Sequence, residues 1–120
     1  MEEKKYCGVK IFAVLLLLNI LLSAKEVPSM EVSDLILDYS RIEGTNICVQ
    51  GEIISMGDIS MLRDRNNLMA SVNLNTKKLS RNLRKNIMQK CTFMNTCLQI
   101  VCGVAQDVDY DKGLIVNKII

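Results

Sequence analysis

The spacing of apolar residues predicts one helix followed by three strands in the first two thirds of the chain. Apolar side chains recur every three or four positions across residues 30–42, with charged residues between them, which is typical of an amphipathic helix. Ser29 is a suitable N-cap for this helix, and Gly44 is a suitable residue to end it. From residue 46 the period becomes two, which predicts a strand that ends at a turn around Gly57.

Two more strands and a second helix follow this turn. Residues 59–63 and 68–74 have the alternation and composition of strands, and the polar residues 64–67 between them form a turn. Thr76 is predicted to cap a helix over residues 77–88, because its apolar positions lie four apart on one face. A connector at 91–97, a strand at 98–105, a turn at 107–113 and a strand at 114–120 complete the chain.

This order of elements predicts the fold class. A helix, three strands, a second helix and two strands is the order of the OB-fold, a five-stranded Greek-key barrel. We therefore predict a mainly β domain at 31–120: a five-stranded OB-fold barrel with an N-terminal helix and a helix between strands 3 and 4. Gly51 and Gly103 interrupt the first and fourth predicted strands, and we predict that they are bends where the two strands coil past each other.

The N-terminal 24 residues have the pattern of an export signal. Three lysines precede an apolar stretch at 11–22, and the small residues Ser23 and Ala24 follow it. Twelve helical residues span about 18 Å, less than the roughly 30 Å hydrocarbon core of a bilayer. Leu22 is bulky where a cleavage site prefers a small residue, so an uncleaved membrane anchor formed by residues 9–22 is the alternative. We expect an exported protein, periplasmic or secreted, with a linker at 25–30.

Four cysteines follow the export signal. An even number in a small exported domain predicts two disulfides. If both bend glycines face the core, Cys48 and Cys102 point to the same outer surface of neighbouring antiparallel strands, close enough for a bond. We favour the pairing of Cys48 with Cys102 and of Cys91 with Cys97, and the other two pairings and free thiols are the alternatives.

Composition argues against catalysis and against a metal centre. The chain contains no histidine, which removes the commonest general base and the commonest zinc ligand together. It also has no glycine-rich phosphate loop, and its cysteine spacings differ from those of zinc knuckles. We expect a protein that is not an enzyme and holds no cofactor and no metal.

The candidate ligand-binding residues are basic. Residues 65–90 contain seven lysines and arginines and no acidic residue, and such a run can hold phosphates or an anionic membrane surface. The candidates are Arg63, Arg65, Lys77, Lys78, Arg81, Arg84 and Lys85. A solvated helix face is the alternative. Residues 40–92 carry no aromatic ring, although OB-folds that hold single strands stack bases on such rings.

One stretch of sequence resembles a known family. The string VSDLILDYSRIEGTNICVQGEII is similar to the opening of extracytoplasmic bacterial OB-fold proteins of the tRNA-anti-like type. Leu35, Tyr39, Val49 and Gly51 match the pattern of that opening, and Cys91 and residues 101–103 match the later half, so the resemblance covers residues 32–120. The resemblance implies an OB-fold and export, but it does not by itself imply that the protein binds RNA.

Two functions follow as expectations. The first is a small exported OB-fold binding or assembly module of the bacterial envelope, non-catalytic, whose partner is a protein or an envelope component. The alternative is an oligonucleotide-binding OB barrel that uses the basic helix for phosphate contacts. Phosphate contacts make binding strongly dependent on salt, whereas an apolar protein interface is far less sensitive. Membrane contact is expected through the N-terminal segment if it is not cleaved.

Overall fold

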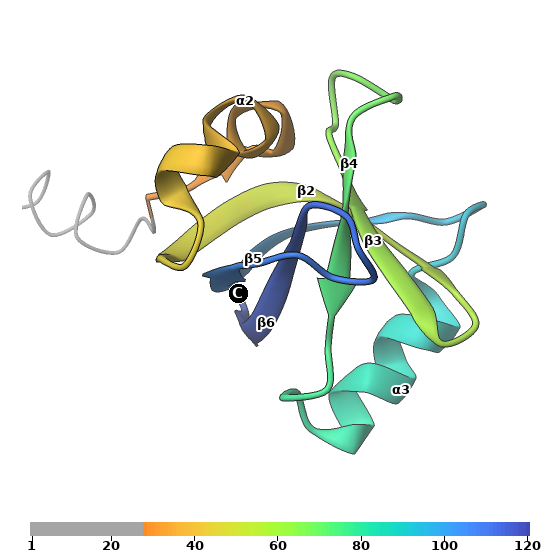
Figure 1. Ribbon diagram of the computed structural model, residues 1–120. Coiled ribbons are helices and arrows are strands. Elements are labelled where there is room, and N and C mark those ends of the chain that lie inside the picture. Colours follow the sequence, from red (N-terminus) through yellow and green to blue (C-terminus); the bar gives the residue numbers. More distant parts are fainter. Residues whose placement is uncertain (1–27) are drawn as a thin grey trace, which may run out of the picture.

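The computed structural model of the chain describes residues 28–120. The predicted signal peptide or anchor at 1–24 therefore lies outside the described residues, as does the first half of the predicted linker, 25–27. The elements, shown in Figure 1, are β1 (Met30–Glu31), α2 (Val32–Ile42), β2 (Asn46–Met56), β3 (Ile59–Arg63), β4 (Ser71–Asn75), α3 (Arg81–Lys90), β5 (Cys97–Ala105) and β6 (Gly113–Ile119). Within this part of the chain neither helix has the length and apolarity that crossing a bilayer requires.

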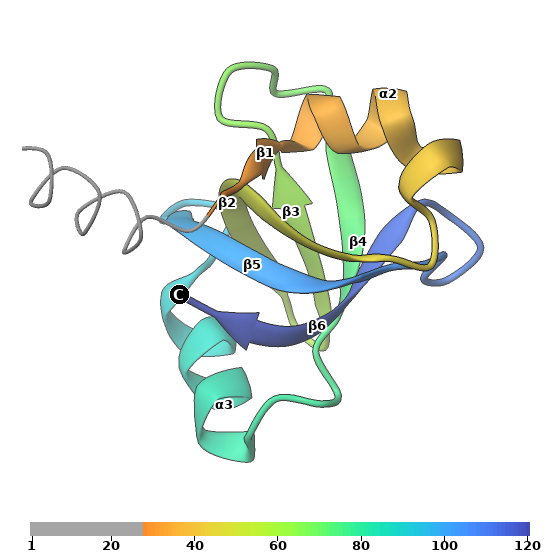
Figure 2. The same ribbon diagram turned by 90° about the vertical axis from the view of Figure 1, so that its left-hand side faces the viewer.

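Five strands close into a barrel. The order β2-β3-β4-β6-β5 returns to β2, because β2 pairs with β3 on one side and with β5 on the other. All pairings in the ring are antiparallel except that of β4 with β6. Figure 2 shows these strands curving around one core, with α2 at one end and α3 at the other. The predicted OB-fold is thus confirmed, with an extra strand, β1, that no sequence pattern indicated.

The first helix begins two residues later than predicted. Met30 and Glu31 pair in parallel with Val49 and Gln50 of β2, which takes them out of the helix. Glu31, not Ser29, is the N-cap, and its backbone N–H donates to the Asp34 carboxylate at 3.3 Å. This difference arises because β2 offers hydrogen-bond partners to the backbone of Met30 and Glu31, which helical periodicity alone would place in α2.

The third barrel strand is shorter than predicted, because its first three residues belong to a loop. The strand β4 begins at Ser71, and the predicted strand residues Leu68 and Met69 are 67% and 92% exposed. The loop is organised around buried Asp64, whose carboxylate accepts hydrogen bonds from the backbone N–H groups of Asn66 and Asn67 at 2.8 and 3.0 Å. This local capping competes with strand pairing and keeps residues 66–70 out of the sheet.

The second helix begins four residues later than predicted and ends two residues later. Ser80, not Thr76, is its N-cap, and the Ser80 hydroxyl accepts from the backbone N–H of Leu83 at 3.2 Å. Residues 77–79 form a turn in which Leu79 is buried, so that this turn is pinned to the core ahead of the helix. Lys77 and Lys78 therefore lie in a turn and not on the helix.

The two bend glycines allow close backbone approach. A Cβ atom at Gly51 would lie 2.8 Å from the Arg63 carbonyl oxygen and 2.9 Å from the Val32 side chain, so only glycine fits where β2 passes under the start of α2. A Cβ at Gly103 would overlap the backbone of Ile115 in β6. The pairing of β5 with β6 shifts register at Gly103, as expected of a bend.

Candidate functional site

The seven predicted basic residues fall into two groups. Arg63 lies directly opposite Glu52 in the pairing of β3 with β2, and its guanidinium donates two hydrogen bonds to one Glu52 oxygen, at 2.6 and 3.2 Å. Arg65 donates to the Glu31 carboxylate at 2.7 Å and so links the loop after β3 to the N-cap of α2. Both arginines are therefore engaged in ion pairs within the fold.

Four of the other five line one cleft. It has a volume of about 590 Å³ and lies between α3 and the hairpin of β2 and β3. The cleft cations, as we call them, are Lys77, Arg81, Arg84 and Lys85; the other lining residues are Ser55, Gly57, Asp58, Ser60, Thr76, Ile87 and Met88. Three ion pairs exist among residues 28–120, and none includes a cleft cation. Lys78 is exposed and does not line the cleft.

Local sequence explains why the cations converge. The Ser80 cap starts α3 at Arg81, and a spacing of three or four residues then places Arg81, Arg84 and Lys85 on one side of the helix. Buried Ile87 anchors the helix in the core. The backbone N–H of Ser55 donates to the carbonyl of Cys91 at 2.6 Å, which fixes the C-terminal end of α3 to β2.

The cleft has the chemistry of an anion site. Its lining combines four cations with a single carboxylate, Asp58, and with the side chains of Ser55 and Ser60, which face each other across β2 and β3. Guanidinium, ammonium and hydroxyl groups donate hydrogen bonds to phosphate, sulfate or carboxylate oxygens. The lining therefore offers several hydrogen-bond donors that can hold an anion.

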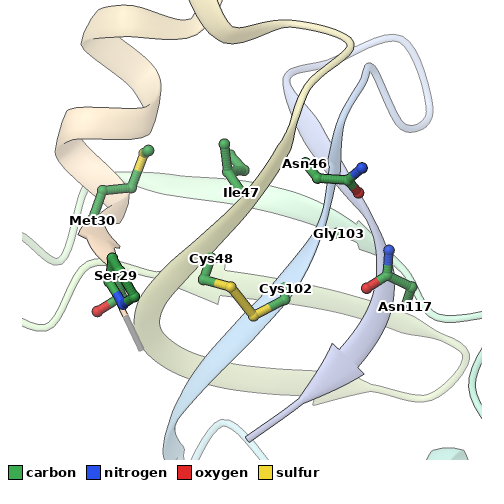
Figure 3. A pocket seen from close by; sticks show the side chains of 9 residues that line it. Ser29, Met30, Asn46, Ile47, Cys48, Cys102, Gly103 and Asn117 are labelled. Carbon is green, nitrogen blue, oxygen red and sulfur yellow. A yellow bond between two sulfur atoms is a disulfide. The ribbon is translucent and has the colours of Figure 1, made fainter. Parts of the chain in front are cut away.

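A second hollow lies at the opposite end of β2. It has a volume of about 510 Å³, and Figure 3 shows the Cys48–Cys102 disulfide bridging β2 and β5 among its lining residues. The two cysteines pair directly in the sheet, with their Cα atoms 4.0 Å apart, and Cys91 is bonded to Cys97. These are the two pairings that the sequence favoured. The polar side chains of this hollow, those of Ser29, Asn46 and Asn117, are uncharged.

Two buried polar side chains serve the fold. Burial would raise the pKa of Asp64, but hydrogen bonds from the backbone N–H groups of Ser33, Asn66 and Asn67 outweigh it and lower that pKa. The hydroxyl of Tyr39 donates to Asp107 at 2.7 Å, and burial together with this bond raises the pKa of Tyr39 to about 12. Neither role was visible in the sequence, because their partners lie up to 68 residues away.

No family model matches the chain, and no curated protein matches it in sequence. The likeness to the tRNA-anti-like proteins therefore stays a prediction. Among solved structures, the chain is similar to a protein assigned as an aspartyl-tRNA synthetase from Leishmania major Friedlin, with 17% identity and a TM-score of 0.54. That match covers 79% of this chain and 20% of the other, so this chain spans about a fifth of that protein.

A second solved structure, the OBody AM1L10 bound to hen egg-white lysozyme, has 15% identity and a TM-score of 0.47. It covers 67% of this chain and 80% of that one. At such low identity the synthetase likeness supports the barrel fold and nothing more specific.

Proposed function

We propose that this chain is a small exported OB-fold binding module, non-catalytic, whose partner is a protein or an envelope component that presents an anionic group to the cleft. Two disulfides in so small a domain are typical of proteins that fold in an oxidising compartment. The predicted export signal supports the same location. The resemblance to extracytoplasmic OB-fold proteins supports an envelope role.

The observation that carries this proposal is that the fold pairs some of the basic residues with carboxylates and not others. Arg63 and Arg65 have carboxylate partners, whereas the four cleft cations converge on a hollow without forming an ion pair to any of residues 28–120. Like charges held around a concave surface repel one another, and an anion that enters the hollow relieves that repulsion. A cluster of this kind is what an anion-binding site requires.

The second candidate is an oligonucleotide-binding barrel that uses α3 for phosphate contacts. The cleft cations favour it, since phosphate is an anion of suitable chemistry. Two features disfavour it. Arg63 and Arg65 are paired within the fold, and residues 40–92, which include β2, β3 and β4, provide no ring on which a base could stack.

Titration with inorganic pyrophosphate at low salt tests the site. In NMR spectra of labelled protein we expect the amide signals of Lys77 and of residues 81–85 to shift together. Arg81→Glu with Lys85→Glu should abolish these shifts, whereas Lys112→Glu with Lys118→Glu, an equal change of charge at exposed positions outside the cleft, should leave them. Shifts that are absent, or that are scattered over the whole surface, would refute the site.

A short oligothymidine separates the two candidates. Four phosphate contacts to a single strand predict that log K falls against log salt with a slope of about −3. The binding-module proposal expects weak oligothymidine binding, no tighter than that of pyrophosphate. Tight binding with the steep slope, lost in Arg81→Glu with Lys85→Glu, would replace it with the oligonucleotide barrel.

A further inference from the structure

The basic cleft is bordered by exposed apolar side chains. We call this border the apolar rim; it consists of Met88, Phe93 and Met94. Phe93 and Met94 are 65% and 91% exposed, although both are large apolar residues. A soluble domain rarely gathers such residues in one place unless the patch contacts a partner or a membrane.

Backbone pairing connects the rim to the cleft. Met88 lies on α3 and lines the cleft itself. Met56 and Ile59 are also exposed, but they follow Ser55 and precede Ser60 in the hairpin, so their side chains lie on the opposite face of the hairpin from the cleft and do not belong to the rim. Cleft residue Ser55 forms a β-bridge with Thr92, which brings the turn carrying Phe93 and Met94 beside the end of β2.

The turn that carries Phe93 and Met94 is held firmly. Thr92 and Asn95 exchange two backbone hydrogen bonds, at 3.0 and 3.1 Å, and the Cys91–Cys97 disulfide closes the segment at its base. The two apolar side chains therefore project from a fixed turn, and their exposure does not come from a loose loop.

Cations beside protruding apolar side chains match the interface of an anionic bilayer. Lysine and arginine contact headgroup phosphates, while aromatic and aliphatic residues enter the boundary between headgroups and acyl chains. A soluble polyanion would fill the cleft and leave the rim in water. A nucleic acid would leave Met88 and Met94 without partners, because flexible aliphatic chains offer no stacking surface.

We propose that the cleft cations and the apolar rim together form a docking surface for anionic phospholipid membranes. This inference rests on the proposed role of the cleft as an anion site. The cations contact the headgroup phosphates, and Phe93 and Met94 enter the interfacial layer. The charge of the cleft attracts the protein to the anionic membrane from a distance, and the rim then makes apolar contact with the interfacial layer.

A single tryptophan can report on the rim, since the chain contains none. The mature chain expected after export, residues 25–120, with Phe93→Trp is mixed with vesicles of phosphatidylcholine and phosphatidylglycerol, and separately with vesicles of phosphatidylcholine alone, because the apolar segment 9–22 would itself bind to vesicles. We expect a blue shift of the fluorescence with the anionic vesicles only. Met69→Trp is the matched control, because Met69 is even more exposed than Phe93, at 92% against 65%, but lies on the β3–β4 loop away from the cleft. Its fluorescence should not change.

Two double variants separate the contributions of charge and rim. Arg81→Glu with Lys85→Glu should weaken co-sedimentation with the anionic vesicles by roughly 30-fold or more, given the contribution of each basic residue near such a surface. Phe93→Ser with Met94→Ser should weaken it about tenfold and leave the pyrophosphate shifts intact. Leu68→Ser with Met69→Ser, and Lys112→Glu with Lys118→Glu, should bind as the unmodified protein does.

Each outcome decides between the two proposals. If pyrophosphate shifts the α3 amides but the Phe93→Trp fluorescence is unchanged with anionic vesicles, the membrane inference is wrong and the anion site stands. Loss of both signals would remove both proposals. Anionic-vesicle binding that survives Phe93→Ser with Met94→Ser unchanged would also overturn the inference, as would oligothymidine binding tighter than vesicle binding.

Discussion

The two ends of the barrel differ in whether their basic side chains are paired with carboxylates. At the α2 end, Arg63 and Arg65 meet Glu52 and Glu31, and buried Asp64 is capped by three backbone N–H groups. At the α3 end, four cations surround a cleft, and none of them forms an ion pair with another residue in the part of the chain that the structure describes. The arginines of the first end and the cations of the second come from one basic stretch of sequence. Their availability depends on which carboxylates the fold brings to them.

This contrast separates charge that stabilises the fold from charge that is available to a partner. Removing one partner of a half-buried ion pair such as that of Arg63 destabilises the fold, because the other charge stays partly desolvated without a partner. An exposed cation without a partner contributes little to stability. Removing charge should therefore destabilise the α2 end and leave the α3 end folded.

Removal of a disulfide should have the largest effect on the free energy of unfolding, and the loss should differ between the disulfides at the two ends. Cys48→Ser with Cys102→Ser opens a link between residues 54 apart, whereas Cys91→Ser with Cys97→Ser opens one between residues 6 apart. Loop entropy predicts losses of about 4 and about 2 kcal/mol. Urea denaturation of both variants measures the two losses. Equal losses would show that the loop length does not govern them.

Asp64→Ala should be nearly as severe. It removes a buried carboxylate that accepts backbone hydrogen bonds from Ser33, Asn66 and Asn67, at 2.9, 2.8 and 3.0 Å. We expect a loss of about 3 kcal/mol in the free energy of unfolding, because these donors are left without an acceptor. Asp58→Ala, at the exposed carboxylate of the cleft, is the matched control and should change stability by less than about 0.5 kcal/mol. Chemical denaturation compares them.

The Asp64 carboxylate should also make the stability of the protein fall at acid pH. The pKa of Asp64 is lowered in the folded state, so its contribution is present above the unfolded pKa of about 4 and is lost as pH falls through the folded value. Melting temperatures measured from neutral to acid pH should therefore fall below about pH 4. Asp64→Asn should be less stable at neutral pH and should show a shallower fall. An identical slope in both proteins would contradict this origin.

Gly51→Val should cost about 2 kcal/mol, because its side chain would overlap the Arg63 carbonyl and the Val32 side chain. Gly57, in the hairpin turn at the cleft end, is its counterpart. Gly57 has a φ of +67° and open space around it, so Gly57→Ala strains only the backbone and should cost about 1 kcal/mol. Thermal melts that show Gly51→Val to be neutral would contradict the close approach.

The smallest expected effect is the most direct test of the contrast. Arg63→Ala removes the pairing with Glu52, whose side chain is 23% exposed, and should cost about 1 kcal/mol. Arg84→Ala in the cleft should cost less than about 0.5 kcal/mol. Denaturant midpoints measure both. A larger loss for Arg84→Ala would show that the cleft cations stabilise the fold.

Much of the barrel was predictable because its signals are local. A change of period from helix to strand, turn residues around Gly57, and the order of the elements all act within a few residues. The pairing of Cys48 with Cys102 was favoured for a related reason, since alternation along two neighbouring strands places both side chains on one surface.

Element boundaries were less predictable, because distant groups decide several of them. β1 forms because Met30 and Glu31 pair with β2. The loop before β4 forms because the Asp64 carboxylate accepts hydrogen bonds from its backbone N–H groups. The start of α3 moved to Arg81 because Leu79 is buried and Ser80 caps the helix. For β1 and for the turn at Leu79 a tertiary contact outweighs a local preference that is worth about 1 kcal/mol or less per residue, whereas the Asp64 loop and the Ser80 cap depend on hydrogen bonds to residues two or three positions away.

The sequence by itself determined the fold class, the two glycine bends and the presence of a concentrated basic stretch. These follow from periodicity, backbone sterics and composition, which are properties of neighbouring residues. Only the tertiary structure decided which cations are available. Carboxylates from β1 and β2 neutralise Arg63 and Arg65, while α3 and the hairpin leave Lys77, Arg81, Arg84 and Lys85 around an open cleft beside an apolar rim. Coulomb attraction depends on distance in space, and distance in space is what a linear sequence does not contain.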